Sequence, residues 1–441
     1  MGPTRIFSKK VNSNSDRPVM LDTNGDKLSR NRQMDFITRR ELLKGGSMIA
    51  VGLVAPRWLS TIAHADMLKS AGGGKTSDTI LVVCQLSGGN DGLNMVVPYT
   101  DPLYAKYRPT LAHKEDKVLK LNETLGLHPA MGGLQELFKE GKVAVVNNVG
   151  YPQANRSHFR SMEIWQSASP DSKLKHGWLG RHFDHQLLTG PLNPVVALGL
   201  STDKPLALAG EHASVPCFAS LADVNNLLGD ANTEKMLRDI QGIDAMAGSA
   251  TAVVQQASRT ALDAMSILKQ KVATYKSQST YAEDDFGRGF KQIAQLIATS
   301  PATRVVYFSA GGFDTHAKQA ENHEKLLKGF SDAIKTFQRE MEAIGQADKV
   351  VVLTFSEFGR RVEENASLGT DHGAAAPMFV VGNQVKGGVY GPNPNLANLD
   401  NGDIAFTQDF RGVYATALDQ WMGGDSGVVL GQSFDHLPVL K

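Results

Sequence analysis

The chain has 441 residues, with 46 Lys and Arg against 45 Asp and Glu, which gives a formal net charge of +1. This balance excludes a strongly basic nucleic-acid-binding protein and an acidic disordered chain. Hydrophobic residues make up 41% of the chain and charged residues 21%, so it can bury a large core. Because no run of about 18 uninterrupted apolar residues occurs, we expect no membrane-spanning helix.

The first 65 residues have the composition of an export signal. Residues 1–37 are polar and are expected to be disordered. Arg39 and Arg40 begin a basic segment, a modestly apolar stretch follows over 45–55, and an A-x-A sequence resembling a cleavage site lies at 63–65. Paired arginines in this setting resemble the twin-arginine signal. We therefore expect export by the twin-arginine machinery to the periplasm or beyond, with an ordinary amphipathic helix as the alternative.

The chain after residue 65 is mildly acidic. Removing residues 1–65 takes away 11 Lys or Arg and 5 Asp or Glu, leaving 35 basic against 40 acidic residues. Such a body has no electrostatic reason to bind nucleic acid or an anionic membrane surface. Cys84 lies within an apolar run and is expected to be a buried strand thiol. Two cysteines as distant as Cys84 and Cys217 do not establish a disulfide.

Short apolar runs alternate with helical patterns after residue 78. Five runs have the character of strands buried on both faces, and they cover 79–85, 143–149, 304–309, 349–355 and 378–381. Between them, apolar residues recur at helical spacing over 286–297 and 326–344. This alternation predicts an α/β fold with a mostly parallel sheet and helices on both faces. We expect residues 66–441 to form one domain with a helical insertion over about 221–300.

Polar loops follow the predicted strands, and in open α/β sheets ligands gather at the carboxyl ends of the strands. Asp91 follows the first strand as a possible oxygen ligand for a metal, although an ordinary Asn-Asp turn explains it as well. Asp314 and His316 follow the third strand directly after two glycines. Their spacing suits two ligands on one loop, while helix capping by Asp314 is an equal alternative.

Two further candidates lie near the fourth and fifth strands. Glu357 follows the fourth strand, and His372 precedes the fifth. Either residue alone would usually be structural. Because four strand ends each supply a ligand-type or nucleophile-type side chain, the pattern predicts one metal site at this edge of the sheet. Among the 12 histidines, His316 and His372 are the strongest ligand candidates, and His158 is a weaker one.

The segment Arg156-Ser157-His158 follows the second strand and precedes a predicted helix. Ser157 can serve simply as the helix N-cap. A serine at this position also lies in a positive field that favours an anion or an activated alkoxide. Arg156 could bind phosphate or sulfate oxygens, and His158 could move protons.

The runs 85–94, 311–316, 356–361 and 370–382, behind a twin-arginine leader, resemble the exported domain-of-unknown-function 1501 family over nearly the whole mature chain. That family looks like a branch of the alkaline phosphatase and sulfatase-like superfamily. The resemblance implies a parallel-sheet α/β fold with metal ligands and a nucleophile on the strand-end loops. By this resemblance, the matching positions are Asp91 for the first-strand metal aspartate, Ser157 for the nucleophile, Asp314 and His316 for the second carboxylate–histidine pair, and His372 for the late histidine.

The chain departs from the superfamily pattern in two places. The carboxylate–histidine pair at Asp314 has the spacing Asp-x-His, whereas the superfamily usually has Asp-x-x-x-His. Glu357-Phe358 stands where Asp-His is usual, so one imidazole ligand is missing. A two-zinc site, a single ion, calcium or magnesium in place of zinc, and no metal at all are therefore all open.

The leading hypothesis is an exported, metal-dependent hydrolase of phosphate or sulfate esters. Ser157 would attack the ester and Arg156 would neutralise developing charge. The divalent cation would be held by Asp91, Asp314, His316, Glu357 and His372. The alternative is a non-catalytic exported binding or envelope-assembly protein that keeps the fold, which the missing ligand at Phe358 favours. An oxidoreductase is not expected, because no G-x-G-x-x-G follows the first strand.

Overall fold

The computed structural model describes residues 78–171, 173–222, 235, 238–239, 250–272 and 274–441. The predicted leader and export signal over 1–65 lie outside the described residues. Among the described helices, none is long and apolar enough to cross a membrane.

The central sheet has nine strands among the described residues, in the order β13-β5-β12-β9-β1-β8-β6-β7, with β14 paired to β5. The strands are β1 (Ile80–Leu86), β5 (Val143–Gly150), β6 (Ala197–Leu200), β7 (Cys217–Phe218), β8 (Val305–Ala310), β9 (Val350–Phe355), β12 (Ala376–Val381), β13 (Gly388–Tyr390) and β14 (Gln408–Asp409). β1 pairs in parallel with both neighbours, so that Val82 lies opposite Val306 and Val352. The predicted α/β fold with a mostly parallel sheet is confirmed, and all five predicted strands are present.

Only β12, among the described strands of this sheet, runs against its neighbours, and it is antiparallel to both β5 and β9. Between β9 and β12 the chain forms a hairpin of β10 (Arg360–Glu364) and β11 (Thr370–His372) instead of a crossover helix. Parallel neighbours need a crossover that returns the chain to the starting edge. Because this connection stays at the carboxyl edge of β9, β12 enters the sheet from that edge and begins close to His372.

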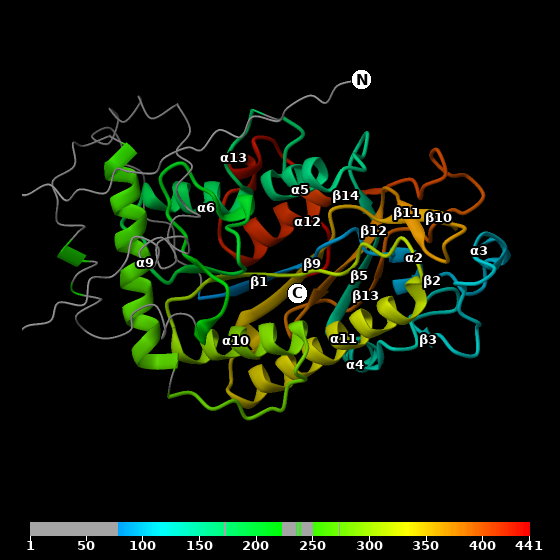
Figure 1. Ribbon diagram of the computed structural model, residues 1–441, viewed down its shortest axis with the longest axis horizontal. Coiled ribbons are helices and arrows are strands. Elements are labelled where there is room, and N and C mark those ends of the chain that lie inside the picture. Colours follow the sequence, from blue (N-terminus) through cyan, green and yellow to red (C-terminus); the bar gives the residue numbers. More distant parts are fainter. Residues whose placement is uncertain (1–77, 172, 223–234, 236–237, 240–249, 273) are drawn as a thin grey trace, which may run out of the picture. The chain divides into compact units, whose positions relative to one another are not determined.

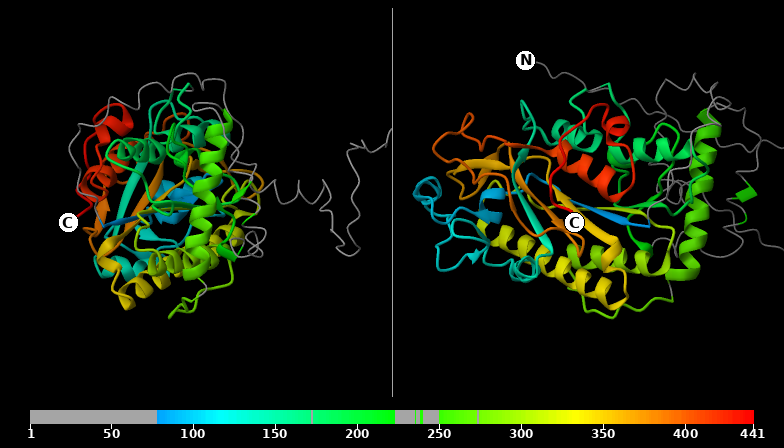
Figure 2. Two further views of the ribbon diagram at one scale, coloured as in Figure 1. Left: turned by 90° about the vertical axis from the view of Figure 1, so that its left-hand side faces the viewer. Right: turned by 180° about the vertical axis from the view of Figure 1, so that it is seen from behind.

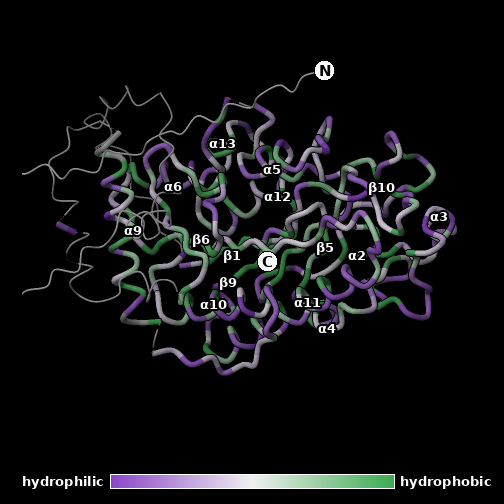
Figure 3. Tube along the Cα trace, in the orientation of Figure 1, coloured by the Kyte–Doolittle hydropathy of each residue, from purple (hydrophilic) through white to green (hydrophobic). Residues whose placement is uncertain are grey.

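Helices cover both faces of the sheet (Figures 1 and 2). The helices on one face are α4 (Gly132–Lys139), α10 (Asp285–Thr299) and α11 (Gln319–Ala343), and those on the other are α5 (His158–Ser167), α6 (Trp178–Leu187), α12 (Phe410–Thr416) and α13 (Ser426–Leu430). Side chains of β1 alternate between the two cores, with Val82 and Cys84 on the α11 face and Leu81 and Val83 on the α5 face. Strands buried on both faces carry continuous apolar runs, as Figure 3 shows along β1, β5 and β9.

Smaller elements flank the sheet. They are α2 (Gly92–Met95), β2 (Val96–Val97), α3 (Pro102–Tyr107), β3 (Leu119–Lys120), β4 (Gly126–Leu127), the 3-10 turns Leu206–Leu208 and Ala347–Lys349, and a π-helical turn over Ala417–Trp421. Strands β2, β4 and β3 form a separate small sheet.

The predicted helical insertion over 221–300 lies partly outside the described residues. Its described part is helical and contains α9 (Ala250–Val272) and α10. Phe290 and Ile293 of α10 are fully buried in the same core as α11, so this helix belongs to the layer that covers the sheet. Cys84 and Cys217 are both free thiols, and burial raises the pKa of each.

A histidine cluster joins α11 to the loop after β4 and to the segment before β3, with His128 and His323 buried and His113 half-buried. The rings of His113 and His128 lie 4.3 Å apart, and those of His128 and His323 lie 6.0 Å apart, between centroids. Burial lowers the pKa of His128 to about 3 and that of His323 to about 4. Both rings therefore stay neutral in the folded protein at pH values where they would be protonated in the unfolded chain.

We expect the free energy of unfolding to fall as the pH drops from about 7 to 4, because the unfolded chain takes up protons near the ordinary histidine pKa of about 6.5 and the folded chain does not. The variant His128→Asn should flatten this slope, because it removes one of the groups that take up a proton on unfolding. The fold should be kept, since Asn Oδ1 can accept the backbone N–H of Ala130 that now donates to His128 Nδ1. Urea unfolding at pH 7.5 and 5 measures the slope for both chains. Identical slopes would contradict the prediction.

Candidate metal site

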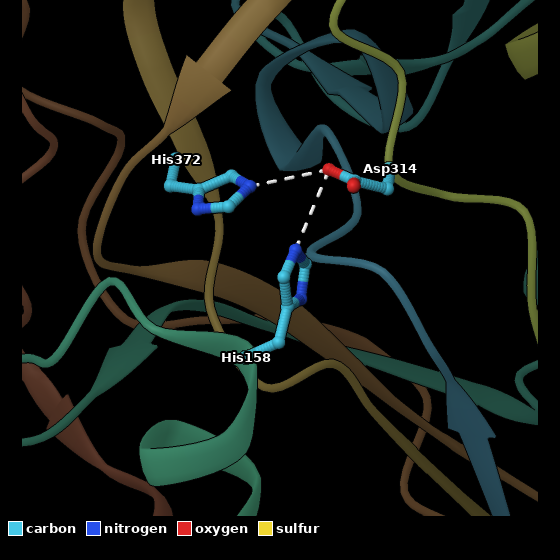
Figure 4. A group of neighbouring side chains, drawn as sticks. All are labelled: His158, Asp314 and His372. Carbon is cyan, nitrogen blue, oxygen red and sulfur yellow. Dashed lines mark hydrogen bonds and ion pairs between the residues drawn. The ribbon is translucent and has the colours of Figure 1, made fainter. Parts of the chain in front are cut away.

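Loops at the carboxyl edge of the sheet bring His158, Asp314, His316 and His372 together. His158 begins α5 after β5, Asp314 and His316 follow β8, and His372 ends β11. Figure 4 shows His158 and His372 directed at the carboxylate of Asp314 from different elements. His158, Asp314 and His372 offer ligand atoms that all lie within 4.8 Å of one another. Of the five expected ligands, Asp314, His316 and His372 lie together here, and His158, the weaker ligand candidate, lies with them.

One oxygen of Asp314 is surrounded by three imidazole nitrogens. Asp314 Oδ1 lies 3.5 Å from Nε2 of His158, 3.0 Å from Nε2 of His316 and 3.2 Å from Nε2 of His372. The Nε2 atoms of His316 and His372 are 2.9 Å apart. All three rings therefore direct the same nitrogen toward one small volume.

The other ring nitrogen of each histidine faces an acceptor. The Nδ1 pairs are His158 with Glu357 Oε1 (2.8 Å), His316 with Asp371 Oδ1 (3.3 Å) and His372 with the carbonyl oxygen of Arg156 (2.8 Å). A neutral imidazole that donates from Nδ1 carries a lone pair on Nε2. Carboxylates and carbonyls that accept from Nδ1 in this way orient histidines so that Nε2 faces a metal.

These residues fit a zinc-type ion. Nε2 of His158 is buried and has no hydrogen-bond partner among the described residues, which costs roughly 1–3 kcal/mol if nothing binds it. Zinc–nitrogen bonds of about 2.0–2.1 Å in a tetrahedron put neighbouring ligand atoms roughly 3.3 Å apart. The three distances from Asp314 Oδ1 to the imidazole nitrogens and the His316–His372 distance, 2.9 to 3.5 Å, are close to that spacing. The ligand atoms of His158, Asp314 and His372 lie within 4.8 Å of one another, and His316 is outside that tighter group. A donor set of three nitrogens and one oxygen favours zinc over calcium or magnesium, which prefer oxygen.

The cluster is open to solvent on one side. The side chain of Asp314 is 48% exposed and that of His316 is 44% exposed, whereas that of His372 is 22% exposed. These exposed fractions mean that the protein does not close over the ligand atoms on this side, so an ion and a substrate could reach them from solvent.

A fully buried guanidinium supports Asp314 from behind. Arg360 donates to Asp314 Oδ1 at 2.6 Å and to the carbonyl oxygens of Thr370 (2.9 Å) and Phe313 (3.1 Å). Burial alone would raise the pKa of Asp314, but the hydrogen bond and charge of Arg360, with the neighbouring histidines, outweigh it and lower this pKa to about 2. The carboxylate therefore stays ionised, as a metal ligand must be.

The loop after β1 lies against the backbone of Asp314, and a glycine makes this approach possible. Gly88 has φ +122°, and a Cβ on it would lie 2.5 Å from the backbone nitrogen of Asp314. The N–H of Gly88 donates to Glu357 Oε1 at 2.8 Å, the same oxygen that His158 contacts. A side chain at position 88 would therefore disturb both the ligand loop and the support of His158.

Asp91 is not brought to the cluster, although it was expected to be a ligand. It is fully buried at the N-cap of α2, and its Oδ2 lies 2.5 Å from Nη1 of Arg108. Burial would raise its pKa, but the charge of Arg108 dominates and holds the pKa at about 2. The carboxylate is therefore used in a buried ion pair, and a ligand role for it has no geometric support.

Glu357 is brought close to the site but behind it. Its side chain is buried, and Oε1 is used by His158 Nδ1 and the Gly88 N–H. The geometry thus makes this expected ligand a support for one. The hydrogen bond to Glu357 raises the pKa of His158, although burial opposes it.

The segment predicted to be catalytic lies at the start of α5. Ser157 is exposed at the N-cap position, and its side chain makes no capping hydrogen bond. Nε of Arg156 donates to Asp403 Oδ2 at 3.0 Å, so part of its guanidinium already has an anionic partner. Ser157 directly precedes His158 in the chain.

Two contributors were missed from the sequence, the supporting roles of Arg360 and Asp371, and His158 was named only as a weaker ligand candidate. Arg360 lies within the Gly-Arg-Arg segment after the fourth strand, and Asp371 lies beside His372. Both lie in polar strand-end segments that were already selected from the sequence. In those segments, roles had been assigned only to Glu357 and to His372.

We expect Glu357→Gln to lower zinc affinity by about 10–100-fold, because the amide can present an N–H in place of the oxygen that holds His158 Nδ1. Competition with a chromogenic chelator measures the affinity. Glu321→Gln is the matched control, since Glu321 has an 80% exposed side chain on α11 and forms an ion pair with Lys325. Equal affinities for the two variants would refute the supporting role.

Residues 128–420, more than half of the chain, match the family described as "Protein of unknown function (DUF1501)". Among curated proteins no match was found. Among solved structures, the chain is similar to a protein in the alkaline phosphatase superfamily from Vibrio parahaemolyticus, at 9% identity and a TM-score of 0.37, covering 87% of this chain and 77% of that one.

The chain is similar to two further solved structures. The C-terminal periplasmic domain of EcEptC from Escherichia coli, in complex with Zn, has 12% identity and a TM-score of 0.29, with 70% of this chain and 73% of that chain covered. A His 135 Asp mutant of TAB5 alkaline phosphatase with Mg bound has 10% identity and a TM-score of 0.32, with 72% and 95% covered. The sequence motifs and the match over 128–420 agree, and the chain belongs to the DUF1501 family.

Proposed function

We propose that this protein is an exported, zinc-dependent hydrolase of phosphate or sulfate esters. The observation that carries the proposal is the convergence of three Nε2 atoms on Asp314 Oδ1, with every Nδ1 turned to an acceptor. A cation bound among the three nitrogens and the carboxylate oxygen would account for this arrangement. Its solvent-open side, at the carboxyl edge of the sheet, is where substrates of α/β enzymes bind.

The ion would be held by His158, Asp314, His316 and His372. When bound, a divalent ion of this kind polarises an ester oxygen and lowers the pKa of a coordinated nucleophile. Glu357, Asp371 and the carbonyl of Arg156 hold the three rings in the tautomer that leaves Nε2 free. Arg360 keeps Asp314 ionised and in place.

Ser157 is the nucleophile in this proposal. Its Oγ would bond to phosphorus or sulfur while the ester oxygen leaves with the alcohol, and water would release the acid in a second step. The N-terminus of α5 favours negative charge at this hydroxyl. Nη1 of Arg156 has no hydrogen-bond partner among the described residues, so it can donate to a non-bridging ester oxygen.

We expect the zinc-loaded protein to hydrolyse 4-nitrophenyl phosphate or 4-nitrophenyl sulfate, and Ser157→Ala to lower kcat by orders of magnitude while zinc stays bound. Release of 4-nitrophenolate and elemental analysis give the two readouts. Ser433→Ala, at an exposed serine of the C-terminal segment, is the control. Full activity of Ser157→Ala would remove the nucleophile from the proposal. Stoichiometric zinc without turnover of either ester would favour the non-catalytic binding protein.

Export by the twin-arginine route belongs to the same proposal, because that route carries folded proteins and a zinc site can be filled before transport. Replacing Arg39 and Arg40 by lysines should retain the protein in the cytoplasm. Fractionation of the native host followed by immunoblotting measures this, and unchanged export would contradict it.

A further inference from the structure

A second site lies along the same edge of the sheet. An open cavity of about 610 Å³ is bounded by the carboxyl ends of β6 and β8, the first turns of α10 and the end of α5. Gly311 belongs to its wall, and Asp314 follows three residues later. The cavity is therefore on the β6 side of β8, next to the loop that carries two of the candidate metal ligands.

Two buried amides in the wall of this cavity have unused hydrogen-bonding groups. Gln85 is 4% exposed and Gln166 is 7% exposed. Oε1 of Gln85 accepts from Gln166 Nε2 at 3.0 Å and from the hydroxyl of Tyr307, and Gln166 Nε2 also donates to Tyr307 at 3.2 Å. This leaves Nε2 of Gln85 as a donor and Oε1 of Gln166 as an acceptor, each without a partner among the described residues.

Neither atom is among the fully buried unpartnered atoms of the described residues, so both are accessible from the cavity and can bind a ligand there. A hydroxyl group can accept from one and donate to the other, and adjacent hydroxyls can do both at once. The hydroxyls of Thr202 and Ser309, also in the wall, extend this polar surface. The pattern is suited to a polyhydroxylated molecule.

One cation in the wall is unpaired. Lys204 is half-buried and makes no hydrogen bond or ion pair with the described residues. Burial lowers its pKa, and the electrostatic contributions of Cys217 and Asp184 offset this only in part. The other cation of the wall, Arg288, is already paired with Asp285 at 2.5 Å. An anionic group on the ligand would supply the partner that Lys204 lacks.

We propose that this cavity binds a carbohydrate that carries phosphate or sulfate groups, with its hydroxyls on Gln85 and Gln166 and an anionic group on Lys204. The inference rests on the proposed function, because it names the class of ester. Gln166 and His158 are eight residues apart on α5, which is ~12 Å along the helix axis. A substrate that reaches from Lys204 past Gln166 to the metal site is therefore an oligosaccharide or polymer with several ester groups.

Binding can be measured without turnover. Isothermal titration calorimetry of the full chain would use dextran sulfate, heparin hexasaccharide and a sulfated galactan hexasaccharide, with unsulfated dextran for comparison. We expect at least one sulfated probe to bind more tightly than dextran, and Lys204→Met to weaken it about 10-fold or more, as loss of a charge-assisted hydrogen bond predicts. Gln166→Leu should weaken the same probe as well.

Lys117→Met removes one charge from a 68% exposed lysine far from the cavity wall in sequence, and it should leave the affinity unchanged. Calorimetry measures binding and the 4-nitrophenyl esters measure turnover, so that failure of the hydrolase proposal is distinguishable from failure of this one. Absence of binding to all three sulfated probes, equal binding of sulfated and unsulfated dextran, or equal effects of Lys204→Met and Lys117→Met would each overturn the proposal.

Discussion

The variant His372→Ala should lower zinc affinity by more than ~100-fold, beyond the range given by loss of a second-shell partner alone. His372 supplies one of four converging ligand atoms, and its Nε2 lies 2.9 Å from that of His316 and 3.2 Å from Asp314 Oδ1. Asp314→Asn should have an effect of the same order, because it removes the negative charge at the centre of the cluster. Equilibrium dialysis against zinc, read by elemental analysis, gives the affinities.

Zinc should also stabilise the wild-type protein against unfolding. A ligand at 100 times its dissociation constant adds about 2.7 kcal/mol to the free energy of unfolding. This increment should be absent from His372→Ala and present in His212→Ala, which removes an exposed histidine outside the cluster. The proposed site would be refuted if His372→Ala bound zinc with the affinity of the wild type. It would also be refuted if the wild type bound magnesium or calcium but not zinc.

Arg108→Met should destabilise the folded protein by about 3–5 kcal/mol, because it leaves the buried carboxylate of Asp91 without a counter-charge. Both side chains are 0% exposed, and Nη1 of Arg108 lies 2.5 Å from Asp91 Oδ2. Arg108 also donates from Nε to the carbonyl oxygen of Val362 and from Nη2 to that of Arg361, both at 2.9 Å. Arg108 thus links Asp91, in the loop after β1, to the backbone of β10, and the substitution removes this link.

The loss of stability in Arg108→Met should be largest near neutral pH and smaller at acid pH. The pKa of Asp91 is lowered to about 2 in the folded protein, against about 3.9 in the unfolded chain. Its contribution to stability is therefore complete above pH 4 and is lost as the pH falls through about 2. Without Arg108 the carboxyl group can be buried in its protonated form, so the difference between variant and wild type should shrink at acid pH.

Urea unfolding at pH 7 and pH 3 would measure this difference. Lys106→Met, at an exposed position of α3, is the matched control and should change stability by less than about 0.5 kcal/mol. The double variant Asp91→Asn with Arg108→Met should recover part of the loss, since the unpaired charge is removed. An Arg108→Met protein as stable as Lys106→Met at pH 7 would contradict a structural ion pair.

The candidate site was partly predictable. Asp314, His316 and His372 were found because strand-end loops of a parallel sheet meet at one edge, and this holds whatever the details of packing. Asp91 satisfied the same rule, yet it pairs with Arg108 and Gln319 instead. A carboxylate on a strand-end loop can serve either purpose, and only the side chains around it decide which.

Amino-acid order alone determined the α/β class, the five main strands and the edge at which polar side chains gather, because burial on both faces demands continuous apolar runs and parallel strands share one direction. Tertiary structure decided which groups became ligands and which became supports. His158 and Glu357 are 199 residues apart, and their 2.8 Å contact is what aims Nε2 at Asp314. Such pairings depend on the placement of loops from separate strands to within an ångström, and no local pattern of residues specifies that distance.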